Sequence, residues 1–333
     1  KYVITDAIRD RNVLRFIIEY IGRYKKKGNT FIDIEVEDID TKEVIDSPDR
    51  KEKIVDYIIR YHNQKTHNRE YTGMFAVSSI RNLISYYELF KKKNQAGEHD
   101  LRVAAIFTYG ANEEDQDATG LLPGHFEDMD QVMDEVADDF QKVAEEKVAY
   151  ITSHSRVKLD EMIADYNAMY NTAFSTRDGL QFENYFKDIS KRIKDREKIS
   201  FNDKDRVDIL LVVNMFLTGF DAKKVNTLYV DKSLHYHGWI QAFSRTNRIL
   251  NEQKSQGNIL CFRNLKKSTD EAIALFSNKD AKDVIFLPPY EAVLRRFSQA
   301  FVKLLTIAPP PKSVDELPDE DAEMKFVQAF REL

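Results

Sequence analysis

Short runs of apolar, β-branched residues recur along this chain and constrain its fold more than any other feature. Several runs, such as 207–213, lack the polar alternation of a strand with one wet face. Strands that are covered on both faces give this pattern. Helical periodicity separates most of the runs, and strands that alternate with helices predict a parallel α/β sheet. The runs are Met74–Ser79, Arg102–Tyr109, Val207–Val213, Val225–Val230 and Asn258–Phe262.

The stretch between the second and third predicted strands, residues 111–206, is much longer than one crossover helix requires. Apolar residues recur at helical spacing in 159–169 and again in 182–193, so we expect a largely helical insertion in the α/β core. Residues 54–61 also read as a helix, and the chain after Leu265 is mostly helical in pattern.

Composition excludes several classes of protein. With 333 residues, 42% of them hydrophobic, the chain can bury two or three domain cores. Its formal net charge of −6 argues against a protein that coats nucleic acid with its whole surface, but allows a local basic track. The longest apolar run, Ile209–Leu217, is too short to span a bilayer, and the single cysteine, Cys261, suits a reducing compartment. We expect a cytoplasmic location and no membrane contact.

The strongest chemical signal lies in one short segment. Gln241, Arg245 and Arg248 stand at i, i+4 and i+7 of a predicted helix that begins near Gly238, so they are expected to share one face. Two guanidinium groups and an amide on one face suit a polyphosphate, because each guanidinium offers a planar fork of donors. A surface helix with solvated arginines would have the same spacing.

A second signal follows the apolar run 207–213. The segment Thr218-Gly219-Phe220-Asp221 is expected at the carboxyl edge of the sheet, where α/β folds bind ligands. Glycine lets main-chain N–H groups approach a phosphate, and the aspartate can orient a ribose or a neighbouring arginine. An ordinary strand-to-turn connection explains the same residues.

Taken in this order, the two segments resemble motifs V and VI of superfamily 2 helicases and translocases. Motif VI there reads Gln-x-x-Gly-Arg-x-x-Arg, and Ser244 replaces its glycine here. Thr218 takes the place of the usual arginine of motif V. Both departures are similar to the motor (R) subunits of type I restriction enzymes in particular. The resemblance covers most of the chain and is most specific over residues 207–248.

The resemblance implies a fold class and a division of the chain. The fold would be α/β, with a RecA-like parallel sheet flanked by helices. Residues 71–265 would form the second RecA-like helicase lobe, with about 111–206 as its largely helical insertion. Residues 1–70 would hold the end of the first motor lobe and a linker, and residues 266–333 would form a helical extension.

Roles for individual residues also follow from the resemblance. Arg248 would act as the arginine finger on the γ-phosphate of ATP, with two supporting residues from the same helix. The preceding segment would bind nucleotide and couple its state to the surface that grips DNA. The catalytic residues implied are Arg248, Arg245 and Gln241, and the coupling residues are Gly219, Asp221 and Thr218.

Two surfaces are candidates for contacts with the DNA backbone. Ser78, Ser79 and Arg81 lie in a segment that resembles motif IV, where the family places hydroxyl groups against the backbone. A predicted helix over 182–198 carries a lysine at every third or fourth position, which suits phosphates, although a solvated face is the usual explanation. Its lysines are Lys187, Lys191, Lys194 and Lys198.

The sequence has no phosphate-binding loop of the form GxxxxGK[ST], and no Asp-Glu pair ends a predicted buried strand. ATP and Mg²⁺ are therefore expected to bind mainly to a first lobe upstream, where this family also carries its nuclease. The chain alone is expected to be inactive. His235 and His237 lack the further ligands of a metal site, so no metal is expected here.

The activity implied is that of the C-terminal part of an ATP-dependent double-stranded DNA translocase in a type I restriction-modification enzyme. Its partners would be double-stranded DNA and the modification (M) and specificity (S) subunits. Two alternatives stay open on the sequence: the lobe of another superfamily 2 DNA or RNA helicase, and a non-catalytic α/β binding module.

Overall fold

The computed structural model describes residues 3–21, 46–107, 145–177, 179–217, 219–234, 237–263, 265–276, 284–288, 290–309 and 311–333. The chain divides into two compact units, residues 1–285 and residues 286–333.

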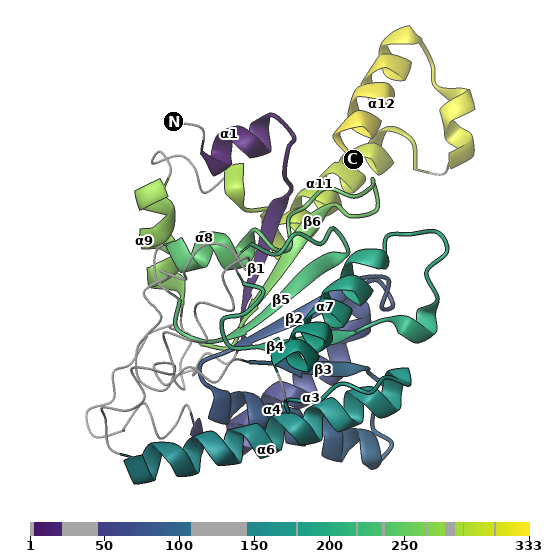
Figure 1. Ribbon diagram of the computed structural model, residues 1–333. Helices are drawn as coiled ribbons and strands as arrows, with labels where there is room; N and C mark the ends of the chain where they lie inside the picture. Colours follow the sequence, from purple (N-terminus) through teal and green to yellow (C-terminus); the bar gives the residue numbers. More distant parts are fainter. Residues whose placement is uncertain are drawn as a thin grey trace. The chain divides into compact units, whose positions relative to one another are not determined.

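Six parallel strands form the sheet of the first unit, in the order β1-β6-β5-β2-β4-β3 (Figure 1). The strands are β1 (Arg15–Tyr20), β2 (Thr72–Val77), β3 (Val103–Ile106), β4 (Ile209–Val212), β5 (Val225–Asp231) and β6 (Gln256–Cys261). An all-parallel sheet flanked by helices confirms the predicted α/β class and is the arrangement of a RecA-like lobe.

The core of the first unit lies along the central strands. Every residue of β2, β4 and β5 is buried. These strands carry the continuous apolar runs from which they were predicted, and the burial explains the runs, because helices cover both faces of a parallel sheet.

Three helices pack together on one side of the sheet (Figure 1). They are α3 (Pro48–Lys65), α4 (Ile80–Gln95) and α6 (Glu145–Tyr170). The predicted helix at 54–61 is confirmed within α3. Further helices in the described part of this unit are α1 (Ile4–Arg9), α7 (Gly179–Asp195), the 3₁₀ turn Asp203–Asp205, α8 (His237–Phe243) and α9 (Lys266–Phe276).

The described part of the insertion is helical, as expected. In α6, Leu159, Met162, Ile163 and Tyr166 are buried at the predicted spacing. In α7, the hydroxyl of buried Tyr185 donates to the carbonyl of Ala105 in β3 at 2.7 Å, which anchors the helix at that edge of the sheet. The acidic first part of the insertion lies outside the described residues.

Strand β1 was not predicted from the sequence. It pairs with β6 from Arg15↔Gln256 to Tyr20↔Cys261, so the sheet reaches well beyond the region 71–265 in which it was expected. The reason is its position: β1 is an edge strand in which only Phe16 is buried, and it lacks a continuous apolar run. The division of the chain near residue 70 stays a prediction.

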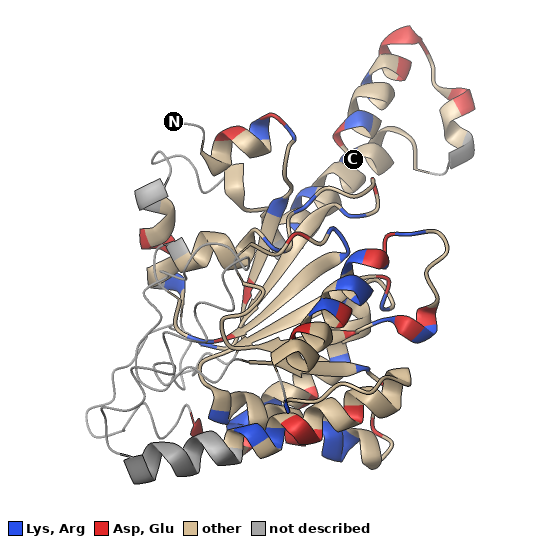
Figure 2. Ribbon diagram, viewed as in Figure 1, with Lys and Arg blue, Asp and Glu red and all other residues tan. Residues whose placement is uncertain are grey.

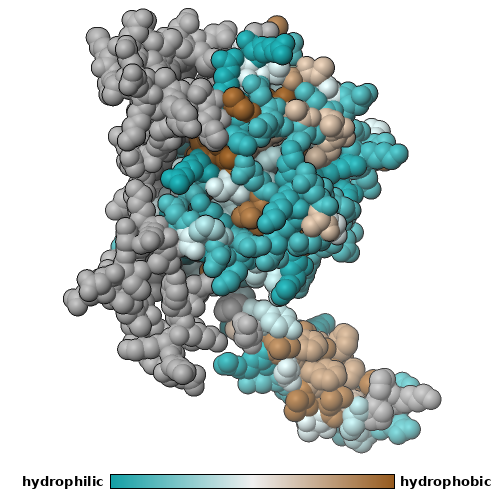
Figure 3. Space-filling model, turned by 90° about the horizontal axis from the view of Figure 1, so that it is seen from below, coloured by the Kyte–Doolittle hydropathy of each residue, from teal (hydrophilic) through white to brown (hydrophobic). Residues whose placement is uncertain are grey.

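The second unit is a helical hairpin, and this confirms the expected helical character of the C-terminal extension. It consists of α11 (Tyr290–Ile307), the 3₁₀ helix Pro311–Glu316 and α12 (Glu320–Glu332), with α11 packed on α12. Figure 3 shows apolar side chains gathered on its surface. Those more than a third exposed include Tyr290, Phe297, Phe301, Val302, Met324, Val327 and Phe330. Among the described residues, no helix has the length and apolarity needed to cross a membrane.

Candidate functional site

The connection between β4 and β5 carries the predicted coupling residues, but it does not place them where they were expected. Strands β4 and β5 are parallel. The connection between them therefore runs from the carboxyl edge of the sheet back to the amino edge before β5 begins at Val225. Asp221, four residues before that point, therefore lies near the amino edge of β5, not at the carboxyl edge. Gly219 has φ +66°, the left-handed conformation that glycine adopts at low cost. Thr218 lies outside the described residues.

The segment with the two candidate arginines is only partly helical. Helix α8 ends at Phe243, and a tight turn follows in which the N–H of Thr246 donates to the carbonyl of Phe243 at 2.9 Å. The hydroxyl of Thr246 donates to the same carbonyl at 2.9 Å. Residues whose side chains bond to nearby main chain favour such turns over continued helix. The expectation that Gln241, Arg245 and Arg248 share one helical face is therefore wrong.

A close approach holds this turn against the sheet. A Cβ atom built at Gly257, the second residue of β6, would lie 2.3 Å from Oγ1 of Thr246. The N–H of Leu14, just before β1, donates to the carbonyl of Asn247 at 2.8 Å. Arg248 is consequently seated at the amino edge of β1 and β6, on the same edge of the sheet as Asp221.

Arg245 is an internal anchor. It is buried, its Nε donates to the carbonyl of Gln241 at 3.1 Å, and a terminal nitrogen donates to the carbonyl of Phe220. Burial lowers the pKa of this guanidinium, and the neighbouring charge of Arg248 lowers it further. Arg245 thus connects the two candidate segments through main chain.

Arg248 and Asp221 meet directly. Nε of Arg248 lies 3.2 Å from Oδ1 of Asp221, and the side chains are 38% and 62% exposed. The contact is an ion pair without the geometry of a hydrogen bond. An ion pair this exposed contributes only about 0–1 kcal/mol, so another anion can replace the carboxylate. Gln241 presents a buried Oε1 that has no hydrogen-bond partner among the described residues.

Lys254 completes this group, and sequence reasoning missed it. Its side chain is almost fully buried, and Nζ donates to the carbonyls of Lys223 at 2.6 Å and Val225 at 2.8 Å. Burial lowers the pKa of this amine to about 7, while Asp221 acts in the opposite direction. No motif position marks it; the only signal in the sequence is a lysine shortly after Arg248.

We call Asp221, Arg245, Arg248 and Lys254 the amino-edge site. Arg245, Arg248 and Lys254, whose pKa is about 7, bring positive charge close to one carboxylate, and Arg245 and Lys254 are buried. Such a surplus of positive charge is unfavourable in a partly buried setting unless an anion joins it. The site therefore fits a phosphate group.

The predicted motif IV residues lie at the opposite, carboxyl edge, after β2. Ser79 caps α4, accepting from the N–H of Asn82 at 3.2 Å, and the Ser78 hydroxyl accepts from Nδ2 of Asn82 at 2.8 Å. Both hydroxyl groups keep a proton that can be donated to a phosphate oxygen. Arg81 is exposed in the first turn of α4.

The lysines predicted to line a DNA track lie on or just after α7, a segment in which basic and acidic residues are mixed (Figure 2). Lys187 pairs with Glu183, and Lys198 pairs with Asp195 at 2.8 Å. Lys191 is exposed, and Nζ of Lys194 lies 5.5 Å from the centre of the Phe220 ring. The stripe is thus a mixed-charge face in which Lys191 and Lys194 are the better candidates for phosphate contact.

A different carboxylate, Asp231, ends β5 at the carboxyl edge. Its oxygens accept from Arg50 at 2.6 Å, from the hydroxyl of Tyr86 at 2.6 Å and from Arg263 at 3.1 Å. Burial alone would raise its pKa, but Arg50, Arg263 and Tyr86 outweigh burial and lower it. We call these four residues the Asp231 cluster.

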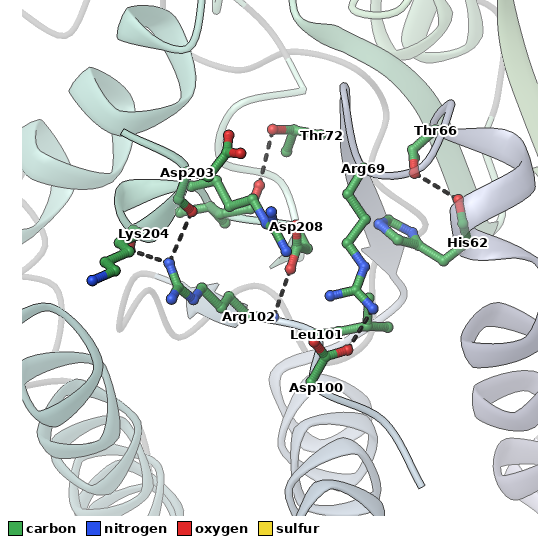
Figure 4. Close-up of polar contacts among 12 residues, drawn as sticks. His62, Thr66, Arg69, Thr72, Asp100, Leu101, Arg102, Asp203, Lys204 and Asp208 are labelled. Carbon is green, nitrogen blue, oxygen red and sulfur yellow. Dashed lines mark hydrogen bonds and ion pairs between the residues drawn. The ribbon is translucent and has the colours of Figure 1, made fainter. Parts of the chain in front are cut away.

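Another buried network ties α7 to the amino ends of β2, β3 and β4 (Figure 4). Asp208 accepts from the N–H of Arg102 at 2.9 Å and pairs with Arg206 at 2.9 Å. Arg196 donates to the hydroxyl of Thr72 at 2.7 Å and to the carbonyl of Val207 at 2.8 Å. Nε of Arg206 has no hydrogen-bond partner among the described residues, but it faces Asp208 within the network, so we interpret the network as structural.

His237 has no described side chain, and His235 lies outside the described residues. Within the described ranges, no group of three or more His, Cys, Asp or Glu side chains could hold a metal ion.

Comparison with known proteins places this chain in a defined family. Residues 69–264, more than half of the chain, match the family described as Type I restriction enzyme subunit R domain 3. Residues 285–333 match Type I restriction and modification enzyme - subunit R C terminal. The chain belongs to the family of type I restriction enzyme R subunits.

Individual relatives agree with this assignment. The chain is 42% identical over 331 residues to Type I restriction enzyme SauCOLORF180P endonuclease subunit of Staphylococcus aureus, covering 99% of this chain and 31% of the relative. It is 41% identical over 331 residues to the SsaAORF53P endonuclease subunit of Staphylococcus saprophyticus, covering 99% and 32%. A putative MjaVIIP endonuclease subunit of Methanocaldococcus jannaschii is 25% identical over 279 residues, covering 83% and 23%. The chain thus spans about a third of the length of the first two relatives.

Proposed function

We propose that this chain is the C-terminal part of the ATP-dependent double-stranded DNA translocase subunit of a type I restriction enzyme. It would supply the second RecA-like lobe. The observation that carries this proposal is the amino-edge site, where the segments that resemble motifs V and VI meet through Asp221 and Arg248. Membership of the R subunit family supports the same assignment.

Arg248 is the proposed arginine finger. It is half-exposed and held only by a weak ion pair, so its guanidinium can turn from Asp221 to a γ-phosphate on a facing lobe. Charge that develops on the phosphate in the transition state is then stabilised by a planar fork of donors. Arg245 supports this function from behind, because it fixes the turn that carries Arg248 to the carbonyl of Phe220. Gln241, in α8, stays a candidate for the same support.

ATP and Mg²⁺ would bind mainly to a first lobe encoded upstream of this chain, together with the nuclease of the enzyme. The chain matches about a third of its relatives' length, which leaves room for both. When bound, Mg²⁺ neutralises charge on the phosphates, while this chain contributes Arg248 and the residues that hold it.

Double-stranded DNA is the proposed substrate of translocation. Ser78, Ser79 and Arg81 would contact its backbone from the carboxyl edge, with Lys191 and Lys194 as further candidates. The M and S subunits are the proposed protein partners. The helical hairpin of residues 286–333, which exposes apolar side chains, is the proposed surface for docking to the modification complex.

Substitution of Arg248 in a full-length R subunit tests the proposal. Arg248→Ala removes a donor needed mainly in the transition state, so we expect DNA-stimulated ATPase and translocation to fall by about 10²-fold or more. Nucleotide affinity should stay within several-fold. Arg248→Lys should restore little, because an ammonium cannot reproduce the planar fork. Steady-state ATPase and nucleotide binding are measured side by side.

Two controls accompany this test. The melting temperature shows whether each variant is folded, and the chain without its first lobe serves as a blank that should release no phosphate above background. Near-normal turnover of folded Arg248→Ala would contradict the proposal, as would clear turnover by the chain alone.

A further inference from the structure

Lys254 occupies an unusual place in the amino-edge site. It belongs to the connection between Arg248 and β6, yet its side chain reaches into the turn that leads from Asp221 into β5. Only 2% of the residue is exposed. Its amine donates to the carbonyls of Lys223 at 2.6 Å and Val225 at 2.8 Å, the residues on either side of Lys224.

Asp221 is therefore held from both sides. Before it, the carbonyl of Phe220 accepts from Arg245; after it, the carbonyls of Lys223 and Val225 accept from Lys254. Both donors come from the segment that also carries Arg248. This arrangement holds the main chain on both sides of Asp221 against the segment that carries Arg248, whatever the Arg248 side chain does.

The charge of Lys254 is costly at this position. Arg248 and Lys224 both lower the pKa of the amine, in addition to burial, and only Asp221 among the surrounding groups favours the ammonium. A neutral donor could satisfy two carbonyls without this repulsion. A cation is useful here in one respect: at neutral pH and below, where a pKa of about 7 leaves the amine charged, it remains as a counterion for Asp221 when Arg248 leaves the carboxylate.

We propose that Lys254 is a positioning residue of the arginine site, which holds the Asp221 segment against the Arg248 segment and compensates Asp221 while Arg248 is engaged with a phosphate. Its effect on turnover rests on the proposed function; its effect on Asp221 does not. Lys254 does not contact the nucleotide, because its donors face main-chain carbonyls.

The kinetic test uses a full-length R subunit with three variants. Lys254→Met keeps the length of the side chain but removes donors and charge, Lys254→Gln keeps a donor without charge, and Lys254→Arg keeps both. Lys223→Met is the matched control, since that side chain is exposed on the same turn. DNA-stimulated ATPase gives kcat and the KM for ATP of each variant, and the melting temperature reports on folding.

We expect Lys254→Met and Lys254→Gln to lower kcat about tenfold or more with KM within threefold, because the transition-state arginine is misplaced while ground-state binding persists. Lys254→Arg should recover most of the loss, and Lys223→Met should match the unchanged subunit. A folded Lys254→Gln with the kcat of Lys223→Met overturns the proposal, as does a loss confined to KM.

A second measurement separates this inference from the proposed function. The unfolding equilibrium of the present chain is measured for Asp221→Asn, Lys254→Met and the double variant. If Lys254 compensates Asp221, Asp221→Asn should cost less when Lys254 is absent, with a coupling of about threefold or more in the unfolding constant. Additive effects overturn the inference even if Arg248 is the arginine finger. If the coupling is found but folded Arg248→Ala has near-normal turnover, the proposed function is refuted and the inference about Lys254 stands.

Discussion

An aspartate lies near each end of strand β5, and the two carboxylates differ in their burial and in the partners that bind them. Asp231, at the carboxyl end, is 1% exposed and accepts from Arg50, Tyr86 and Arg263. Asp221, just before the amino end, has a side chain that is 62% exposed and a single ion pair with Arg248. The first carboxylate accepts from three side chains, whereas Arg245 and Lys254, the other cations near the second, donate to main-chain carbonyls.

The difference separates a structural ion cluster from a site prepared for a ligand. The donors to Asp231 come from α3, α4 and the segment after β6, so they join these elements to β5. The carboxylate is buried among them, which keeps another ligand from replacing one of these donors. At Asp221 the positive charges exceed the negative charge, and the exposed pair is weak. We infer that a cluster whose charges are neutralised within the fold has a structural role. A cluster with an excess of one sign of charge is a candidate functional site.

Substituting the two aspartates should give the largest contrast in stability. Asp231→Asn leaves two arginines without their buried counterion, so we expect a loss of about 3 kcal/mol or more, roughly 10²-fold in the unfolding constant. Asp221→Asn removes an exposed pair and should cost about 1 kcal/mol or less. Chemical denaturation of this chain gives both values. Equal costs would remove the distinction between the two ends of β5.

A smaller effect concerns the pH dependence of stability at the amino end of β5. The pKa of Lys254 falls from 10.5 to about 7 on folding, mainly through burial, with Asp221, Arg248 and Lys224 as the charged groups that act on it. Between these pH values the unfolded chain binds a proton that the folded chain does not. The free energy of unfolding should therefore rise with pH across that window and be independent of this group below pH 7.

Denaturation of the unchanged chain and of Lys254→Met over pH 7 to 10 measures this contribution. The unchanged chain should gain up to about tenfold per pH unit in its folding constant relative to Lys254→Met. Parallel profiles of the two proteins would show that the amine keeps its ordinary pKa in the folded chain, and would contradict the lowering of this pKa by burial.

The smallest effect is expected at the carboxyl edge, beside the Asp231 cluster. Arg81 lies outside that cluster and is exposed, so it is free for one phosphate contact. In a full-length subunit, Arg81→Ala should weaken DNA binding a few-fold on every sequence and reduce the salt dependence by about one charge. Lys92→Ala, exposed near the other end of α4, is the control. A loss that depends on base sequence would show that Arg81 reads bases.

Much of the fold could be predicted from the sequence because buried strands and helices carry apolar residues in runs or at helical spacing. Strands β2, β4 and β5 are buried on both faces, and each coincides with a continuous apolar run. The stripe of α6 from Leu159 to Tyr166 was predicted for the same reason. Edge strand β1 has no continuous apolar run, since its stability comes from pairing with β6, more than two hundred residues later.

Some residues of the candidate site were named from the sequence, but their geometry was not predicted. Asp221 and Arg248 were both identified, and the structure brings them together. Periodicity suggested a helix through Arg248, but side chain to main chain bonds of Thr246 end it earlier. The place of Asp221 depends on the direction of β5, and the burial of Lys254 depends on two carbonyls of a distant turn. Neither leaves a local pattern in the sequence.

The pairing of β1 with β6 also determines when the arginine site can form during synthesis. Arg15 is opposite Gln256, and the N–H of Leu14 holds the carbonyl of Asn247, the residue before Arg248. A ribosome that adds roughly 5–20 residues per second needs on the order of ten to fifty seconds to make the chain between these partners. Throughout that time Phe16 lacks the strand that buries it, and the seat of Arg248 does not exist. A nascent chain would therefore stay without a formed amino-edge site until β6 has left the ribosome, and a chain that stalls earlier would expose an unpaired strand to chaperones and proteases.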